Sequence, residues 1–299
     1  MDNIAFVFSG QGDQFPGMGR ELYEKYPAAK RVFDGCERIR PGTLRQCFEG
    51  TEDELRETKN TQPCLYAMEL ATASVLLEKG VIAKMVAGFS LGELVAAAVG
   101  GVFDGETGFR LVCKRGELMQ READRQDTSM AAVMKLPAMQ VQTLCSWYPD
   151  MYPVNFNGPG QTVVAGLSSQ ISDFTADVKK AGGRVIPLKV NAAFHSPFMN
   201  DAARAFAEEL AKANLKKPRI PLYSDRTAEP YGDDAAELLS SQICNPVQWE
   251  KVIGSMIEGG ADTFIEIGPG RTLTNMIRRI HAGVKTAVAA EYLREVKEC

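Results

Sequence analysis

Residues 85–92 read MVAGFSLG, and this stretch decides the fold. Residues 85–88 are a short apolar run that predicts a buried strand, and residues 92–99 are mostly small and apolar, which favours a tightly packed helix. Between them, Gly88, Ser90 and Gly92 fit the G-x-S-x-G pattern, in which a sharp strand-to-helix turn exposes a serine hydroxyl. The stretch predicts an α/β protein with Ser90 as its nucleophile.

Strands and helices alternate on both sides of this turn. The alternation argues for a mostly parallel sheet with helices on both faces, in an α/β domain. We expect strands at residues 4–8, 85–88, 220–224 and 263–267, and helices at residues 17–34, 63–79, 92–99, 106–123, 197–213 and 272–281.

The pattern changes after about residue 124. The order becomes strand, helix, strand, strand, helix, strand, which is typical of a ferredoxin-like α+β unit. These elements are expected at residues 130–135, 138–147, 152–157, 161–166, 168–181 and 184–190. We therefore predict a small ferredoxin-like domain at 124–190, inserted into a discontinuous catalytic domain made of 1–123 and 191–299.

Composition excludes several classes of function. The chain has 299 residues and a formal net charge of -4, with no run of Lys or Arg longer than two, so we expect no nucleic-acid partner. No apolar run approaches the roughly 18–20 residues of a membrane helix, so no membrane association is expected. The N-terminus lacks a signal-peptide pattern, and seven irregularly spaced cysteines without C-x-x-C suit reduced thiols. We expect a cytoplasmic protein.

Only two histidines are present, His195 and His281, so a histidine-rich zinc site is excluded and no metal is expected. A lone histidine near a loop is commonly structural, but Ser90 needs a base. His281 ends a predicted helix, where a cation suits the helix dipole. His195 is therefore the candidate base.

Two further features have two interpretations each. Residues 10–14, GQGDQ, follow the first strand but lack the third glycine of a dinucleotide loop and the lysine of a P-loop. They form either an ordinary turn or a loop whose backbone N–H completes an oxyanion hole for Ser90. Arg115 lies on a predicted helix, either on a solvated face or as a fork that grips a substrate carboxylate.

Seven short motifs occur in an order that resembles one family. They are GQGDQ at 10–14, GFSLGE at 88–93, RG-x-x-MQ at 115–120, NFNGPGQ at 155–161, FHS at 194–196, NPVQW at 245–249 and EIGPG at 266–270. The chain resembles malonyl-CoA:acyl-carrier-protein transacylases and the acyltransferase domains of polyketide synthases. The resemblance extends from residue 4 to about residue 281. It implies a hydrolase-like α/β domain that carries a small ferredoxin-like insertion, in agreement with the order of the expected elements.

The resemblance implies a covalent relay. Ser90 would attack the thioester of malonyl-CoA and become a malonyl ester, and His195 would act as its base. The acceptor would be the phosphopantetheine thiol of an acyl carrier protein, with no bound cofactor. The backbone N–H groups of Gln11 and Leu91 would stabilise the oxyanion, and the main-chain carbonyl of Gln248 would orient His195.

The resemblance also implies how substrate is bound. Arg115 would bind the malonyl carboxylate, and Gln62, Met119 and Asn157 would line the acyl pocket. Phe194 would crowd an α-methyl group, so malonyl is expected over methylmalonyl. The family commonly has His where this chain has Phe89, which puts pocket polarity and the rate of ester hydrolysis in question. The resemblance suggests a monomer.

Three alternatives compete with malonyl transfer in fatty acid synthesis. A freestanding acyltransferase that serves a polyketide synthase would use the same chemistry. A hydrolase that clears acyl groups from carriers would gain nothing from a carboxylate clamp at Arg115. A non-catalytic carrier-binding module would have no use for Ser90, His195 and Arg115 together.

Overall fold

A five-stranded parallel sheet lies at the centre of the computed structural model, which describes residues 2–190 and 192–295. The strand order is β7-β2-β1-β8-β9, and every neighbouring pair is parallel. The strands are β1 (Ile4–Phe8), β2 (Met85–Gly88), β7 (Leu222–Tyr223), β8 (Thr263–Ile267) and β9 (Lys285–Val288). The expected α/β class with a parallel sheet is confirmed.

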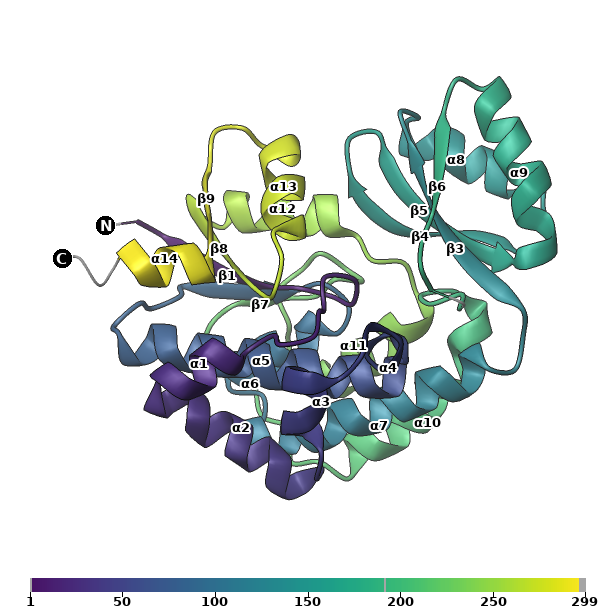
Figure 1. Cartoon of the computed structure of the whole chain (residues 1–299). Coiled ribbons are helices and arrows are strands. Elements are labelled where there is room, and N and C mark those ends of the chain that lie inside the picture. Colours follow the sequence, from purple (N-terminus) through teal and green to yellow (C-terminus); the bar gives the residue numbers. More distant parts are fainter. Residues whose placement is uncertain (1, 191, 296–299) are drawn as a thin grey trace.

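Helices cover both faces of this sheet (Figure 1). The helices of this part of the chain are α1 (Arg20–Lys25), α2 (Pro27–Ile39), α3 (Thr43–Glu49), α4 (Glu52–Arg56), α5 (Thr58–Glu78), α6 (Gly92–Gly100), α7 (Gly105–Ala123), α10 (Asn200–Ala211), α11 (Ala235–Ser241), α12 (Trp249–Glu258), α13 (Thr272–Ile280) and α14 (Ala289–Glu295), with short 3-10 turns η1 (Pro197–Met199) and η2 (Gln242–Cys244). In Figure 1, α5, α6 and α7 lie below the sheet, and α12 and α13 lie above it.

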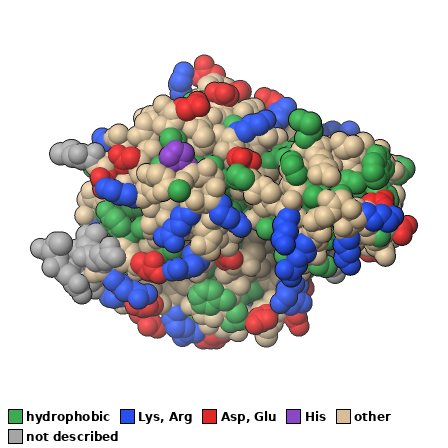
Figure 2. Space-filling model, turned by 90° about the horizontal axis from the view of Figure 1, so that it is seen from above, with side chains coloured by type: hydrophobic (Ala, Val, Ile, Leu, Met, Phe, Trp, Pro, Cys, Tyr) green, Lys and Arg blue, Asp and Glu red, His purple; other side chains and the backbone are tan. Residues whose placement is uncertain are grey.

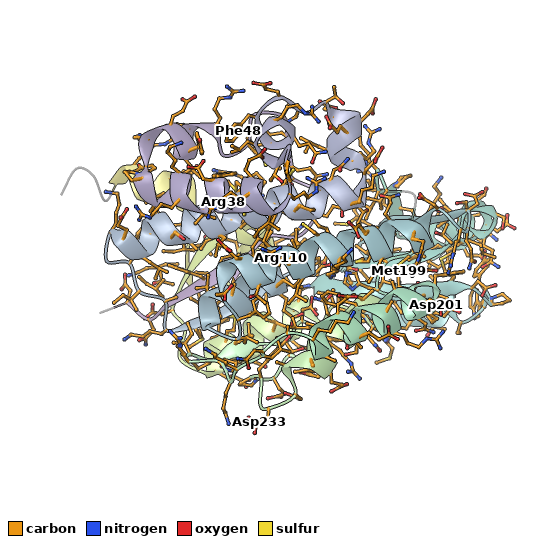
Figure 3. The ribbon with its side chains drawn as sticks, turned by 90° about the horizontal axis from the view of Figure 1, so that it is seen from below. Arg38, Phe48, Arg110, Met199, Asp201 and Asp233 are labelled. Carbon is orange, nitrogen blue, oxygen red and sulfur yellow. The ribbon has the colours of Figure 1, made fainter. Side chains whose placement is uncertain are left out.

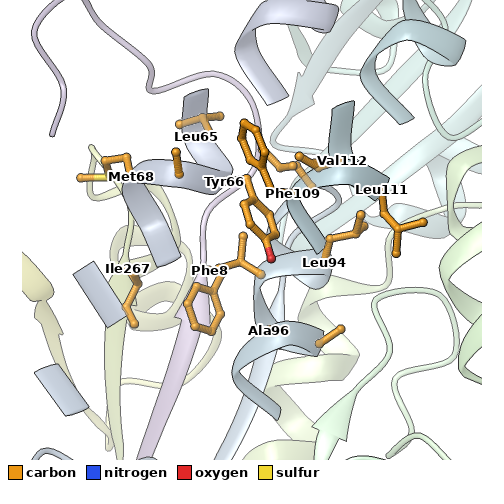
Figure 4. Packing of buried hydrophobic residues seen from close by; sticks show 14 of the residues in the cluster. Phe8, Leu65, Tyr66, Met68, Leu94, Ala96, Phe109, Leu111, Val112 and Ile267 are labelled. Atoms are coloured by element: carbon orange, nitrogen blue, oxygen red, sulfur yellow. The ribbon is translucent and has the colours of Figure 1, made fainter. Parts of the chain in front are cut away.

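The main core lies between the sheet and the lower helices. Figure 4 shows Phe8 from β1, Tyr66 from α5 and Phe109 from α7 among the buried side chains of this layer. All three are fully buried, and the rings of Tyr66 and Phe109 lie 6.0 Å apart. Below this layer, α7 and α10 run together across the underside of the molecule (Figure 3). This packing fixes α7, which carries Arg115.

A second sheet is formed by the segment between α7 and α10. Its strands are antiparallel, in the order β4-β5-β3-β6. The elements are β3 (Thr128–Met134), α8 (Ala138–Cys145), β4 (Met151–Gly158), β5 (Gln161–Leu167), α9 (Ser168–Lys180) and β6 (Arg184–Pro187). Val247, just before α12, exchanges backbone hydrogen bonds of 2.8 and 2.9 Å with residues 156 and 154 of β4. These bonds join the second sheet to the main body.

Several element boundaries differ from the sequence-based expectation. The helix expected at 17–34 is two helices, because Pro27 forces Tyr26 into an extended conformation with φ of -122° and ψ of 117°. The helix expected at 63–79 begins at Thr58, so Pro63 lies inside it and not in its first turn. The strand expected at 184–190 ends at Pro187, and the one at 220–224 contains only Leu222 and Tyr223.

Two kinds of feature are absent from residues 2–190 and 192–295. No helix in that part of the chain combines the length and the apolar character that crossing a membrane requires. No group of three or more His, Cys, Asp or Glu side chains there is placed to hold a metal ion.

Candidate active site

The turn after β2 brings Ser90 to the carboxyl edge of the parallel sheet. Ser90 has a φ of 55°, in the left-handed region that is strained for any residue except glycine. Gly92 sits against β1, and a Cβ on it would lie 2.3 Å from the carbonyl oxygen of Phe8. A Cβ on Gly88 would lie 1.9 Å from the carbonyl carbon of Gly92. Both glycines are therefore required for the turn, as the G-x-S-x-G pattern predicts.

His195 lies directly against the serine. Its Nε2 is 2.8 Å from Ser90 Oγ, and its Nδ1 is 2.7 Å from the main-chain oxygen of Gln242. A carbonyl can only accept, so Nδ1 carries the proton and Nε2 is free to accept from the serine hydroxyl. Burial and the nearby Arg115 lower the pKa of His195 from 6.5 to about 4. The imidazole is therefore neutral at neutral pH.

The carbonyl that orients His195 belongs to Gln242, so the assignment of this role to Gln248 is wrong. The η2 turn lies over the histidine, and His195 N–H also donates to the carbonyl of Ile243 at 3.0 Å. Gln248 lies beyond the segment that pairs with β4, and its N–H donates to the carbonyl of Asp225 at 2.6 Å. A main-chain carbonyl has no side-chain signature, so no signal in the sequence favours Gln242.

Arg115 approaches the same hydroxyl from α7 and is fully buried, which excludes the solvated-face interpretation. Its Nη2 donates to Gln242 Oε1 at 2.8 Å and to Ser90 Oγ at 3.2 Å. Its Nε and Nη1 have no hydrogen-bond partner among the residues that the structure describes. Burial lowers the pKa of Arg115 to about 10, against the opposing effect of two nearby carboxyls, Asp225 and Glu93. The guanidinium stays charged at neutral pH and has free donors beside the serine.

A buried polar network beneath Ser90 contains three residues that sequence reasoning missed. Gln242 Nε2 donates to the carbonyl of Ser90 at 2.9 Å and to Glu93 Oε2 at 3.0 Å. Asp225 Oδ2 accepts from the N–H of Ser90 at 2.8 Å. Glu93 directly follows the glycine of the turn and Asp225 follows β7, the neighbour of β2, but polarity in these places is a weak sequence signal.

Two cavities flank the loop after β1, and Gln11 lines both. A cavity of about 220 Å³ also contains Asn157 and Phe89, and one of about 250 Å³ contains Phe194. Gly10 packs against Phe89, where a Cβ would lie 2.9 Å from the ring and from the carbonyl oxygen. The loop therefore lies beside the serine turn, as the oxyanion-loop interpretation requires.

The remaining predicted residues are buried near these elements. Gln62 on α5 and Met119 on α7 contact each other, with Nε2 and Sδ 3.3 Å apart. Leu91 is buried where α6 begins. Among the described residues, no protein acceptor faces the backbone N–H of either Gln11 or Leu91. Both N–H groups are therefore available to a ligand.

Phe89 packs on an aromatic neighbour. Its ring lies edge-on to Trp249, with centroids 5.4 Å apart. Trp249 is fully buried, and its indole Nε1 has no acceptor in residues 2–190 and 192–295. The Phe at this position makes the wall beside the nucleophile apolar.

Comparison with known proteins gives the family. The acyl transferase domain family matches residues 5–298. The chain belongs to this family. The malonyl CoA-acyl carrier protein transacylase of Bacillus subtilis is 34% identical to this chain over 300 residues. The alignment covers 97% of this chain and 94% of the relative.

Solved acyl transferase structures have the same fold. The malonyl CoA-acyl carrier protein transacylase of Clostridium perfringens superposes with a TM-score of 0.94 at 33% identity, covering 99% of this chain and 98% of the other. A malonyl-transacylase in complex with its type II PKS acyl-carrier protein superposes with a TM-score of 0.94 at 31% identity and covers all of both chains.

Proposed function

We propose that this acyl transferase moves a malonyl group from malonyl-CoA to the phosphopantetheine thiol of an acyl carrier protein. The observation that carries the proposal is the buried Arg115. Two of its guanidinium nitrogens have no partner within the described part of the chain, and the third is bonded to Ser90 Oγ. A buried cation with free donors beside a nucleophile suits an acyl group that ends in a carboxylate. The named relatives support the same substrate.

The reaction has two near-symmetric halves. His195 Nε2 takes the proton of Ser90, and Oγ attacks the thioester carbonyl of malonyl-CoA. The N–H groups of Gln11 and Leu91 hold the oxyanion, and the coenzyme A thiolate leaves with the proton from His195. The phosphopantetheine thiol then gives its proton to His195 and attacks the malonyl-serine ester, and Ser90 Oγ leaves with that proton, which restores the neutral imidazole. No resident cofactor is needed.

Arg115 selects the acyl group in this proposal. Its fork would bind the malonyl carboxylate while Gln62, Met119 and Asn157 line the pocket. Phe194 lies next to the base and would crowd an α-methyl substituent, which favours malonyl over methylmalonyl. The apolar wall at Phe89 would keep water from the ester, because hydrolysis competes with transfer.

Fatty acid synthesis is the proposed pathway. A freestanding acyltransferase for a polyketide synthase is the second candidate, because one similar structure contains a type II PKS acyl-carrier protein. A thioester hydrolase is disfavoured, since an ordinary acyl chain offers no carboxylate to Arg115.

We also propose that residues 124–190 are an inserted ferredoxin-like domain within the catalytic domain formed by 1–123 and 191–299. The order of strands and helices in the second sheet supports this. Figure 2 shows Lys and Arg side chains on both sides of a central hollow on the upper face, which suits an acidic carrier. We further propose that the protein is a cytoplasmic monomer that binds neither nucleic acid nor membranes.

Intact mass after mixing with malonyl-CoA tests the proposal. We expect a malonyl adduct on the parent and none on Ser90→Ala, and we expect the adduct to disappear when a phosphopantetheinylated carrier is added. Malonyl must then appear on the carrier. Accumulation of free malonate without malonyl-carrier would favour the hydrolase, and the absence of any adduct or turnover would contradict the enzyme proposal.

A further inference from the structure

Two buried carboxyls lie beneath Ser90, and the relay described above does not use them. Glu93 on α6 and Asp225 after β7 are essentially excluded from solvent, with exposed fractions of 0% and 1%. They are neighbours, because the backbone N–H of Asp225 donates to Glu93 Oε1 at 3.0 Å. Two adjacent carboxylates that are buried away from water repel each other and are poorly solvated, so we expect one of the two groups to hold a proton.

The donors around the pair identify which group carries the charge. Glu93 accepts from three donors: Asp225 N–H at 3.0 Å, Tyr231 O–H at 2.8 Å and Gln242 Nε2 at 3.0 Å. Among the described residues, the carboxyl group of Asp225 accepts from one donor, the backbone N–H of Ser90, which bonds to Oδ2. A carboxylate that receives several hydrogen bonds is stabilised in its charged form. Glu93 is therefore the member of the pair that ionises first.

The other oxygen of Asp225 has no partner. Asp225 Oδ1 is buried and faces no donor in the part of the chain that the structure describes. A proton on Oδ1 would turn this unsatisfied acceptor into a donor, and the neighbouring Glu93 carboxylate is the acceptor that we infer for it. With this one proton, every oxygen of the pair takes part in a hydrogen bond.

We propose that Asp225 is a neutral carboxylic acid that donates its proton to ionised Glu93, and that this pair positions the nucleophile and its arginine. Asp225 holds the backbone N–H of Ser90 in its strained turn. Glu93 holds Gln242, which in turn bonds the carbonyl of Ser90 and Nη2 of Arg115. The single negative charge of the pair also balances Arg115 before substrate arrives. This positioning role rests on the proposed function of Ser90, whereas the shared proton does not.

Two other charged or titratable groups face the pair: Arg115 on α7 and Tyr231 before α11. His195 lies next in line, because its imidazole is close enough to Arg115 to be affected by the positive charge. Burial raises the pKa of Glu93 to about 7, with hydrogen bonds from Asp225 and Tyr231 opposing the rise, so Glu93 ionises first. Burial, together with the neighbouring Glu93 carboxylate, raises the pKa of Asp225 well above its ordinary value. The folded chain therefore retains a proton that the unfolded chain loses above about pH 4, so this site lowers stability as pH rises.

Isosteric variants distinguish the two carboxyls. In Asp225→Asn the amide N–H₂ replaces the shared proton and its oxygen still accepts from Ser90, so we expect malonylation of the enzyme within about threefold of the parent. In Glu93→Gln the new amide N–H₂ is a donor that faces the donors of Asp225, Tyr231 and Gln242. We therefore expect the rate of enzyme malonylation to fall by about 10–100-fold. Asp225→Ala leaves the N–H of Ser90 without an acceptor and should be impaired, so that Asn rescues what Ala loses.

Thermal unfolding between pH 5 and pH 8 tests the proton independently of activity. We expect the difference in Tm between Asp225→Asn and the parent to shift in favour of the variant by about 2–4 °C or more between pH 5 and pH 8. Asp233→Asn is the matched control, because it makes the same chemical change at an exposed position. Its Tm should change with pH as the Tm of the parent does.

The outcomes separate this proposal from the proposed function. A parent that forms no malonyl adduct contradicts the function, but the thermal comparison still decides the shared proton. Tm values of the parent and Asp225→Asn that run parallel with pH would overturn the shared proton. Asp225→Asn impaired as much as Glu93→Gln, or Glu93→Gln as active as the parent, would overturn the positioning role.

Discussion

The polar groups on the two sides of Ser90 differ in how well they are paired. Beneath the serine, the side chains of Gln242, Glu93 and Asp225 bond to one another or to Ser90, and a single shared proton completes them. Elsewhere around the serine, several buried atoms have no hydrogen-bond partner among the described residues: the oxygens of Asn155, Asn157 and Gln161, which line the cavity of about 220 Å³, the oxygen of Gln62 and two nitrogens of Arg115. Burying an unpaired polar group costs roughly 1–3 kcal/mol, so the unpaired set is expected to bind polar groups of a ligand.

The contrast indicates that the two sides have different functions. The paired side fixes the positions of Ser90, His195 and Arg115, and the unpaired side recognises what arrives. Changes on the paired side should lower the rate for every acyl group. Changes on the unpaired side should alter which acyl group is used.

Replacement of the base should have the largest effect. His195→Ala removes the group that takes the proton of Ser90, so we expect malonylation to fall by about 10³–10⁶-fold. The measurement is the single-turnover rate of adduct formation. His281→Ala is the control, because His281 ends α13 and accepts only from the N–H of Gly283. An equal effect of both variants would contradict the assignment of the base.

Loss of the Gln242 side chain should have an intermediate effect. Gln242→Ala keeps the main-chain carbonyl that orients His195 but removes the bonds to Arg115, Glu93 and the carbonyl of Ser90. We expect a loss of about 10–100-fold, equal for malonyl-CoA and acetyl-CoA, since hydrogen bonds to charged groups contribute about 1.5–3 kcal/mol each. Cys244→Ser in the same turn should retain the parent rate. A loss confined to malonyl-CoA would place Gln242 on the recognition side.

The pH dependence should report the base directly. Burial lowers the pKa of His195 to about 4, so the neutral imidazole that accepts a proton persists as pH falls well below 6.5. We expect kcat/KM for enzyme malonylation to stay level from pH 8 down to about pH 5 and to decline near pH 4. An acidic decline centred near pH 6.5 would mean that the imidazole is solvated in the working enzyme.

A smaller change is expected at Phe194, on the recognition side. Phe194→Leu opens space beside the base, and one methyl group is worth about 1–3 kcal/mol in such a pocket. We expect the preference for malonyl-CoA over methylmalonyl-CoA to fall by roughly tenfold, measured as a ratio of kcat/KM values. An unchanged ratio would show that Phe194 does not contact the α-carbon.

Local sequence patterns were sufficient to predict the turn at Ser90, the candidate base and the helix that carries Arg115, because each depends on neighbouring residues or on a shortage of alternatives. They were insufficient for Gln242, whose carbonyl is chemically the same as any other. They also missed the link between Asp225 and Ser90, which lie 135 positions apart and meet only because β7 pairs with β2. The break at Tyr26 follows from Pro27, because a proline disfavours a helical conformation of the residue before it.

Acyl selectivity of Arg115→Met tests the central contrast most directly. Met keeps most of the buried volume but removes the guanidinium, and thermal unfolding checks that the variant folds. We expect kcat/KM for malonyl-CoA to fall by about 30–5,000-fold, equivalent to about 2–5 kcal/mol, while the value for acetyl-CoA does not fall. An equal fall with both substrates would contradict the carboxylate clamp and would leave Arg115 with a positioning role only.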